Sequence, residues 1–256
     1  MLERLKNEAE SAGIRIDDEQ SRQFVIFYEL LEEHRRRASL TSITGLERVR
    51  DELFLRSLEV AAALDASEIN LFLGEGCRLL DVGSGAGFPG IPLAIAFPEV
   101  QVTLLDSVRK KTDFLQIVID RLELRNVNVH RGRAEEIARL DEHRETYDLV
   151  TSRAVAALPE LAELMIPSCR VGGIAVALKG PDVEAEAEQA ALAATEMGAS
   201  TAELRQLTIG ARERPDTAVV WRKVSQTPGR YPRRVGIPHK RPLIAPIVAQ
   251  ATGGDA

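Results

Sequence analysis

Hydrophobic and polar positions change their spacing once along the chain, near residue 75. Before that point, apolar residues recur at helical spacing, as at Phe24, Phe27 and Leu31, behind the acidic helix cap at Asp17, and this predicts amphipathic helices. After it, short apolar runs alternate with helical stretches. The predicted strands are 78–82, 100–105, 127–131, 147–152 and 173–178, and the predicted helices are 90–97, 108–124, 134–140 and 158–170. This alternation is typical of an α/β fold, a parallel sheet with helices on both faces.

The pattern continues with an acidic helix over 182–197, a short strand and a last strand-like run over 218–224. The acidic side chains of this helix have no basic partner at helical spacing, so we expect them to face solvent. A last strand reached after a helix and a short strand fits an antiparallel hairpin, and the sheet then has seven strands, mostly parallel. We divide the chain into a helical extension (1–73), a sheet domain (74–224) and a C-terminal arm (225–256).

The turn after the first predicted strand carries three glycines, Gly83, Gly85 and Gly87, two residues beyond Asp81. A turn this tight favours positive φ, and a Cβ would keep a ligand away from the backbone. The helix that opens near Pro89 directs free N–H groups toward whatever lies above the turn. A carboxylate, Asp106, ends the next strand, where it is placed to bind two ribose hydroxyls. These features predict a site for an adenosine-containing cofactor.

Two cofactors fit this turn. Residues 85–90 match the nicotinamide pattern G-x-G-x-x-G, which is weak by itself. Asp81 extends the pattern to D-x-G-x-G-x-G, the usual opening of methyltransferases that use S-adenosylmethionine, in which the acidic residue commonly helps to hold the cationic methionine end. The antiparallel last strand also favours that class. A nicotinamide-dependent oxidoreductase and a glycine-rich turn that binds no ligand remain the alternatives.

Further polar residues follow the later strands. Ala134 and Glu135 come after the third strand, Arg153 after the fourth and Lys179 after the fifth. Ligands of open α/β sheets bind at the carboxyl ends of the strands. Each residue alone has an ordinary structural explanation, but together they predict one site at this edge of the sheet.

Composition and charge also indicate a binding partner that carries phosphate groups. The 256 residues have a net charge of −6, yet residues 222–241 hold seven Lys and Arg and no Asp or Glu, interleaved with Tyr231 and three prolines. This segment predicts an extended arm that contacts a phosphate backbone, with a solubilising tail as the alternative. No apolar stretch reaches 18 residues, and Cys77, Cys169 and the four histidines show no metal-ligand spacing. We therefore expect a cytoplasmic protein with no membrane segment and no metal.

With these residues in hand, the chain resembles the bacterial 16S ribosomal RNA methyltransferase G family, also called glucose-inhibited division protein B. The similarity extends from about Phe24 to Pro242. The matching segments are Leu80-Asp-Val-Gly-Ser-Gly-Ala-Gly-Phe-Pro-Gly-Ile-Pro92, Leu104-Leu-Asp-Ser107 with Arg109-Lys-Lys111, Ser152-Arg-Ala154, Ala177-Leu-Lys-Gly180 and Tyr231-Pro-Arg-Arg-Val-Gly-Ile-Pro238.

The resemblance implies a fold and an activity. The fold is that of class I S-adenosylmethionine-dependent methyltransferases, a Rossmann-like sheet, here with an N-terminal helical extension. The activity is transfer of a methyl group from S-adenosylmethionine to N7 of a guanine in the 530 loop of 16S rRNA. The implied partner is 16S rRNA, the small ribosomal subunit or its precursor, and we expect the protein to act as a monomer.

The resemblance also implies binding residues. Gly83 and Phe88 match the glycine turn and the residue beneath the adenosine, and the remaining matched positions are Ala134, Glu135 and Arg153. Guanine N7 has a free lone pair, so no residue is expected to act as an acid or base. Arg153 and Lys179 are therefore candidates for positioning only, and Phe88 and Tyr231 are available for stacking on a base.

The chain departs from the family in its first 60 residues. Ser39, Leu53 and Arg56 stand where members usually have asparagine, histidine and aspartate. If those polar groups help to place RNA, this protein is a divergent member. A ribosome-assembly factor that binds S-adenosylmethionine with little turnover is the resulting alternative.

Overall fold

A seven-stranded sheet forms the centre of the protein, with strand order β3-β2-β1-β4-β5-β7-β6. The computed structural model describes residues 2–38, 40–207, 209 and 215–244, so the departure at Ser39 lies outside the described residues. The strands are β1 (Arg78–Val82), β2 (Gln101–Asp106), β3 (Val127–Arg131), β4 (Tyr147–Arg153), β5 (Cys169–Lys179), β6 (Glu203–Gln206) and β7 (Thr217–Arg222). Pairing is parallel from β3 through β5 and antiparallel at β7 and β6. The predicted sheet and its closing hairpin are confirmed.

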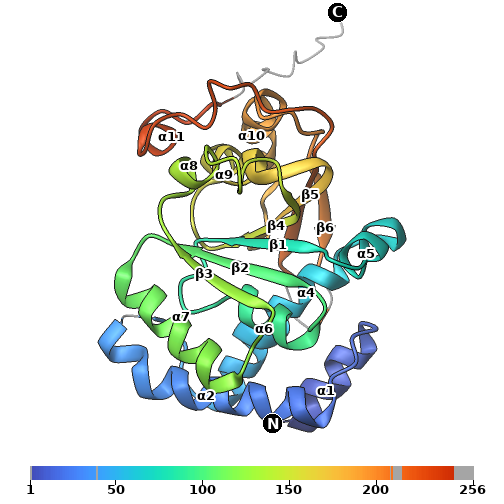
Figure 1. The fold of residues 1–256 in the computed structure, drawn as a ribbon. Coiled ribbons are helices and arrows are strands. Elements are labelled where there is room, and N and C mark those ends of the chain that lie inside the picture. Colours follow the sequence, from blue (N-terminus) through green and yellow to red (C-terminus); the bar gives the residue numbers. More distant parts are fainter. Residues whose placement is uncertain (1, 39, 208, 210–214, 245–256) are drawn as a thin grey trace, which may run out of the picture.

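Helices cover both faces of the sheet (Figure 1). Helices α2, α6 and α7 lie along one face, and α8, α9 and α10 lie along the other. The helices of the described chain are α1 (Leu2–Ser11), α2 (Asp18–Ala38), α3 (Leu46–Arg48), α4 (Arg56–Ala62), α5 (Ala66–Phe72), α6 (Gly90–Ala96), α7 (Arg109–Leu122), α8 (Ala134–Ile137), α9 (Leu158–Met165), α10 (Glu184–Glu196) and α11 (Ile237–Lys240). Burial on both faces explains why β1 reads as a nearly unbroken apolar run.

The helical extension packs into the same core as the sheet. Phe24 and Phe27 of α2 contact Phe54, with ring centroids 5.1 and 5.6 Å apart, and this cluster continues to Leu79 of β1. Phe54 belongs to a π-helical turn, η1 (Val49–Leu55), that runs directly into α4. Helical spacing predicted a helix here but not its wider π winding, which is frequent beside functional sites.

Three element boundaries differ from the sequence-based expectation by three residues or more. The helix predicted to reach residue 170 ends at Met165, a 3₁₀ turn, η2 (Ile166–Ser168), follows, and β5 already begins at Cys169. The paired glycines explain the error, because Gly172 has φ 84° and Gly173 lies against the backbone of Asp148, so a glycine pair that suggests a loop instead belongs to the strand. The helix predicted over 134–140 also stops early, at Ile137.

The acidic helix α10 is not a purely solvated surface, and that expectation was wrong. Its alanines pack against the sheet side of the molecule. Glu186 forms an ion pair with Lys179 at 3.0 Å, and Glu196 forms one with Arg230 at 2.6 Å. Both cations come from outside the helix, so spacing within the helix could not reveal them.

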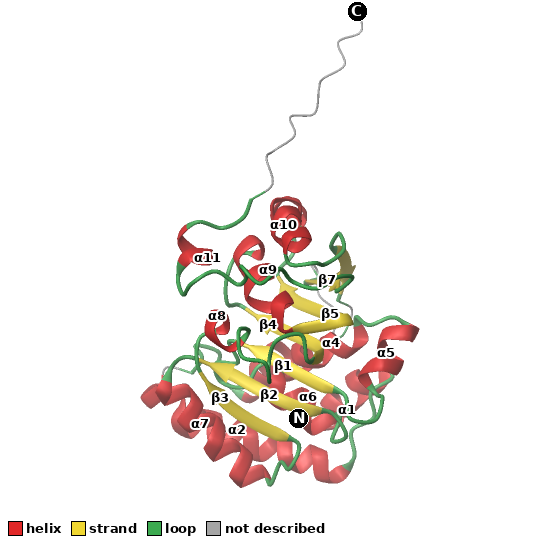
Figure 2. Cartoon of the chain, turned by 45° about the horizontal axis from the view of Figure 1, so that its top comes forward, coloured by secondary structure: helices red, strands yellow, loops and turns green. Residues whose placement is uncertain are grey.

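The C-terminal arm folds back over α8, α9 and α10 (Figure 2). Two arginines of the loop after α8 hold its backbone: Arg139 donates to the carbonyl of Pro232 at 2.9 Å, and Arg144 donates to the carbonyl of Thr227 at 2.7 Å. Tyr231 is buried between them with 7% of its surface exposed. The ring is thus part of the core and is not available to stack on a base, in contrast to the expectation.

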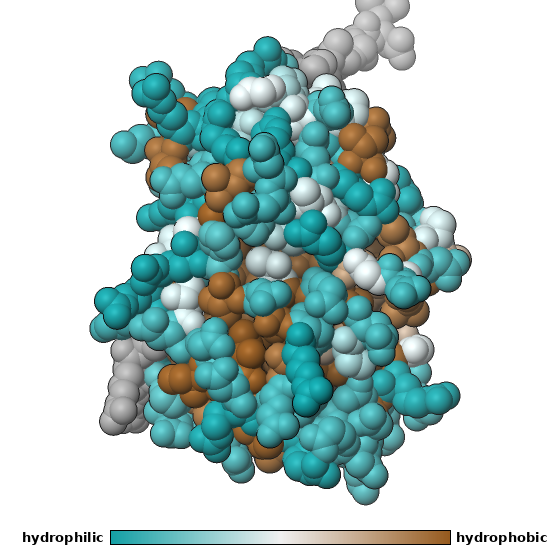
Figure 3. Space-filling model, in the orientation of Figure 1, coloured by the Kyte–Doolittle hydropathy of each residue, from teal (hydrophilic) through white to brown (hydrophobic). Residues whose placement is uncertain are grey.

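The surface is mainly polar on the face shown in Figure 3. Among the described helices none is long and apolar enough to cross a membrane. Within the same residues, no three His, Cys, Asp or Glu side chains gather as a metal site would require.

Candidate cofactor and active site

A cavity of about 260 Å³ opens at the carboxyl ends of β1, β2 and β3, where the sequence predicted a site. We call it the cofactor cavity. Its lining includes four of the predicted residues, Gly83, Asp106, Ala134 and Glu135, together with Lys111, Arg133 and Val155. The fold therefore brings the glycine turn, the carboxylate after β2 and the start of α8 together.

Asp106 is held rigidly at the floor of the cavity and is 6% exposed. Its Oδ2 accepts a hydrogen bond from the Gly85 N–H at 2.9 Å, and its Oδ1 accepts one from the Val108 N–H at 2.8 Å. Each carboxylate oxygen has two lone pairs, so one acceptor position per oxygen is left for a pair of hydroxyls. This arrangement suits a ribose.

The three glycines of the turn serve different purposes. All three have positive φ, and a Cβ on Gly83 would lie 2.4 Å from Val155 while one on Gly87 would lie 2.6 Å from Ile91. At those two positions, side chains of the protein already fill the space that a Cβ would occupy. Within the described part of the chain, a Cβ on Gly85 would meet only the Gly83 carbonyl, at 3.8 Å, which leaves space for a ligand at this position.

Asp81 lies beneath the turn and is fully buried. Its Oδ2 accepts a hydrogen bond from the Gly90 N–H at 3.0 Å, which anchors the first turn of α6. Oδ1 has no hydrogen-bond partner among the residues that the structure describes. Burial raises the pKa of this carboxyl to about 7, against the lowering effect of the Gly90 hydrogen bond. An acceptor left unsatisfied in this way fits the ammonium group of a methionine moiety.

Glu135 connects the cavity to the C-terminal arm. Its carboxylate is 9% exposed, and Oε1 accepts a hydrogen bond from the Gly236 N–H at 2.9 Å. The backbone of Gly236 has φ 76°, in the left-handed region that glycine tolerates best. Glu135 and Gly236 are about a hundred positions apart in the sequence. Only the fold therefore shows that the arm contacts this side of the cavity.

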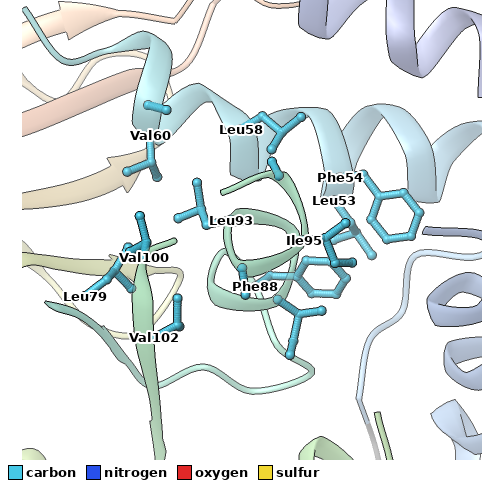
Figure 4. Close-up of a cluster of buried hydrophobic side chains, with 14 of the residues drawn as sticks. Leu53, Phe54, Leu58, Val60, Leu79, Phe88, Leu93, Ile95, Val100 and Val102 are labelled. Atoms are coloured by element: carbon cyan, nitrogen blue, oxygen red, sulfur yellow. The ribbon is translucent and has the colours of Figure 1, made fainter. Parts of the chain in front are cut away.

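Phe88 does not line the cofactor cavity. Its ring is 8% exposed and stacks on Phe27, with centroids 5.2 Å apart and planes at 28°. Figure 4 shows it pointing into the apolar cluster near Leu53 and Phe54. The ring is therefore not available to stack on a base, because the helical extension supplies aromatic partners that bury it.

Arg153 and Lys179 line a second cavity, of about 270 Å³, beyond the carboxyl ends of β4 and β5. Arg153 Nη2 donates to the Glu52 carbonyl at 2.6 Å, which ties β4 to the turn η1. Lys179 Nζ lies 3.0 Å from Glu186. The other lining residues are Arg56, Glu59, Ala154, Leu178, Gly180, Leu207 and Asp216. Arg153, predicted to bind the cofactor, is thus placed in this neighbouring cavity.

The two cavities meet at Ala154, which lines both. Ala154 has φ 54°, a left-handed conformation that costs a non-glycine residue about 1–3 kcal/mol and tends to occur at functional sites. Ala154 is the one residue common to the two linings as described.

Sequence reasoning missed part of the second cavity. Arg56 and Glu59 come from α4, and Asp216 immediately precedes β7. Arg56 Nη2 and Asp216 Oδ2 are 2.5 Å apart, which explains how an arginine is accommodated where the resembled family usually has aspartate. The arginine and the aspartate are 160 positions apart, so no local pattern could have paired them.

Comparisons with known proteins agree with this geometry. Residues 20–214 match the family described as rRNA small subunit methyltransferase G. Curated relatives of that name include one from Pelotomaculum thermopropionicum, 42% identical over 95% of this chain and 99% of its own length. Another, from Roseiflexus castenholzii, is 42% identical over 95% of this chain and 100% of its own length.

Among solved structures, a variant of the protein MtNAS in complex with S-adenosylmethionine has a similar fold, with a TM-score of 0.51. It is 18% identical, and the match covers 80% of this chain and 76% of that one. This likeness concerns the fold alone. The family model and the relatives at 42% identity, both spanning most of the sequence, decide the assignment: the chain belongs to the rRNA small subunit methyltransferase G family.

Proposed function

We propose that the protein transfers a methyl group from S-adenosylmethionine to N7 of a guanine in the 530 loop of 16S rRNA. The observation that carries the proposal is the pair of cavities that meet at Ala154, one beside the ribose-binding carboxylate Asp106 and one beside Arg153. Family membership supports the substrate class. We further propose that the protein works as a monomer in the cytoplasm, on the small ribosomal subunit or its precursor.

S-adenosylmethionine fits the residues present. Asp106 would hold the ribose, and Ala134 and Glu135 the adenine. Asp81, fully buried beneath the turn and outside the cavity lining, would act on the methionine ammonium through its charge. These assignments rest on the open space above Gly85 and on the acceptors described above. A pyrophosphate would instead place its negative charge near Asp81 and Asp106, which disfavours a nicotinamide dinucleotide.

The cofactor supplies the electrophilic sulfonium methyl group, and the protein supplies alignment. Because guanine N7 carries its lone pair in the ring plane, no side chain has to remove a proton. Holding the base in line with the methyl group accounts for about 7–11 kcal/mol of barrier lowering in well-oriented systems. Arg153, fixed by the Glu52 carbonyl, positions substrate, since a cation beside a guanine that is becoming positive would not stabilise it.

Mapping 7-methylguanine in 16S rRNA by mass spectrometry tests this function. Cells with the protein should carry the mark in the 530 loop, and cells without it should lose the mark until the wild-type gene is restored. A chain in which Gly85 is replaced by leucine serves as the inactive control. An unchanged mark in the deleted cells would contradict the proposal and favour an assembly factor with little turnover.

Cofactor binding should release a proton near pH 6. The Asp81 pKa of about 7 leaves this buried carboxyl largely protonated at that pH, and an ammonium group bound beside it would lower the pKa and drive the proton off. Calorimetric titration with S-adenosylhomocysteine in buffers of different ionisation enthalpy should show release of about one proton at pH 6 and almost none at pH 8.5. Asp81→Asn should show no release at either pH, and a wild-type enthalpy independent of buffer at pH 6 would contradict this role.

The Asp81 carboxyl also makes the stability of the folded protein depend on pH. Its pKa is raised from about 4 in the unfolded chain to about 7 in the folded one. The folded protein therefore binds an extra proton between those values, and the resulting stabilisation is full below about pH 4 and is lost as the pH rises through 7.

The arm is expected to contact RNA through fewer charges than the sequence suggested. Arg222, Lys223, Arg230 and Arg233 form ion pairs with carboxylates of the protein. Arg234, Lys240 and Arg241 are exposed and form no ion pair within the described part of the chain. These three cations are the phosphate contacts that we propose for the arm.

Replacing all three cations by alanine should flatten the plot of log rRNA affinity against log salt by about 2, since each phosphate contact contributes about 0.7–0.9 to the slope. Filter-binding at several salt concentrations measures this slope. Arg234→Lys with Arg241→Lys keeps the charges and should keep the slope. An alanine variant with the wild-type slope would show that the outer face of the arm contacts no phosphate.

A further inference from the structure

The loop between β4 and α9, residues 154–157, forms part of both cavities. Ala154 lines both, and Val155 lines the cofactor cavity, where its side chain lies against Gly83 and is 40% exposed. Ala154 has a left-handed backbone conformation. A residue other than glycine keeps such a conformation only where the surrounding structure holds it. The contacts that hold this loop therefore shape the cofactor cavity.

One ion pair contacts the loop at two points. Lys179, at the end of β5, donates from Nζ to the Ala156 carbonyl at 3.3 Å. Its partner Glu186, of α10, accepts a hydrogen bond at Oε1 from the Leu158 N–H at 2.9 Å. The first N–H groups of a helix have no partner within it, so this carboxylate caps α9 from outside. The pair thus holds the loop in its middle and at its end.

Glu186 reaches the loop from outside the site. Its side chain is 27% exposed, on a helix that packs against α9. Within the described part of the chain, Glu186 lines neither cavity, whereas the loop that it holds lines both. Any effect of this carboxylate on a bound ligand is therefore transmitted by the loop.

We propose that Glu186 is a positioning residue of the cofactor site, which keeps the loop 154–157 in place through Lys179 and the Leu158 N–H. If the loop is held for only a fraction of the time, the apparent affinity for a ligand that needs the held loop falls by that fraction. This inference rests on the proposed function, since it concerns the same site, and adds to it a residue that touches no ligand.

Calorimetric titration of the purified protein with S-adenosylhomocysteine tests the inference. Glu186→Ala removes both contacts and should weaken binding about 10-fold, near the lower end of the effect of a hydrogen bond to a charged group. Glu186→Gln can still accept from the Leu158 N–H and should recover part of the affinity. Glu188→Ala, an exposed position on the same helix, should bind as the wild type does.

A double-mutant cycle with Lys179→Met tests whether Glu186 acts through its partner. The protein with both Lys179→Met and Glu186→Ala should bind no more weakly than Glu186→Ala alone, whereas independent contributions would multiply. The unfolding temperature of each variant separates positioning from stability. A lower unfolding temperature of Glu186→Ala with wild-type affinity would mean a purely structural role and would overturn the inference.

Amide hydrogen exchange of the ligand-free protein gives a readout that needs no ligand. Exchange over residues 154–158 should be about 10-fold faster in Glu186→Ala than in the wild type, because local opening sets its rate. In Glu188→Ala it should be unchanged. Equal exchange in the wild type and Glu186→Ala would show that this carboxylate does not hold the loop.

Failure of the inference differs from failure of the proposed function. Wild-type affinity in Glu186→Ala, or a multiplied loss in the double variant, would overturn the inference and leave the proposed function standing. A wild-type protein that binds no S-adenosylhomocysteine would overturn the proposed function, and this inference with it.

Discussion

Replacing Gly85 by leucine should abolish binding of S-adenosylhomocysteine while the protein stays folded. Among the residues that the structure describes, only the Gly83 carbonyl comes within 4 Å of a Cβ at this position, so the new side chain would occupy space that we propose the ligand needs. The backbone at Gly85 has φ 58°, and the strain of a leucine there adds about 1–2 kcal/mol. Calorimetric titration of the purified variant should detect no binding at ligand concentrations that saturate the wild type.

Gly13 provides the matched control. It has φ 77°, no described residue lies within 4 Å of its Cβ position, and it precedes α2 and does not line the cofactor cavity. Gly13→Leu therefore introduces the same kind of backbone strain without the steric block. If Gly85→Leu and Gly13→Leu bound the ligand equally well, the open space above Gly85 would not be the ligand site.

Arg233→Ala should reduce the free energy of unfolding by about 3–5 kcal/mol, the usual effect of leaving a buried charge without its partner. Glu163 of α9 is 0% exposed. Arg233 Nη2 lies 2.6 Å from its Oε2, and the Arg233 N–H donates to its Oε1 at 2.7 Å. The side-chain hydrogen bond to Glu163 also raises the pKa of the Arg233 guanidinium. Urea unfolding followed by circular dichroism measures the loss.

The adjacent arginine is the control for this prediction. Arg234 is exposed, and Arg234→Ala should change the unfolding free energy by less than about 0.5 kcal/mol. Combining Arg233→Ala with Glu163→Leu should recover much of the lost stability, because the buried charge is removed as well. Equal urea midpoints for the Arg233 and Arg234 variants would mean that the arm does not stabilise the sheet domain.

The strands and most helices could be predicted because their pattern is local. A strand buried on both faces needs an apolar run whatever its neighbours are, and β1 falls on the expected residues 78–82. The carboxyl ends of the strands then necessarily carry the site, which is why Asp106 and Glu135 were found together. The prediction failed at the start of β5, which was expected at residue 173, because the Gly172 N–H already bonds the Lys223 carbonyl across the sheet.

The direction in which a side chain points could not be predicted from the local sequence pattern in the same way. An aromatic residue after a glycine turn can point to a ligand or to the core, and Phe88 points to the core because α2 presents Phe27 to it. Tyr231 is buried for a similar reason, since Arg144 donates to its carbonyl at 2.9 Å and holds the arm down. Each outcome depends on residues distant in sequence, and their positions follow from packing rather than from local spacing.

By itself, the sequence determined the class of fold and the family and placed the candidate cofactor residues at one edge of the sheet, because strand periodicity, the glycine turn and the acid after β2 are contiguous patterns. Tertiary structure decided which members of those patterns face a ligand. Arg233 and Arg234 are neighbours of one type, and only the approach of buried Glu163 from α9 makes the first structural and leaves the second exposed. The physical reason is that an ion pair forms between side chains that the fold brings within hydrogen-bonding distance, and that distance is unrelated to separation along the chain.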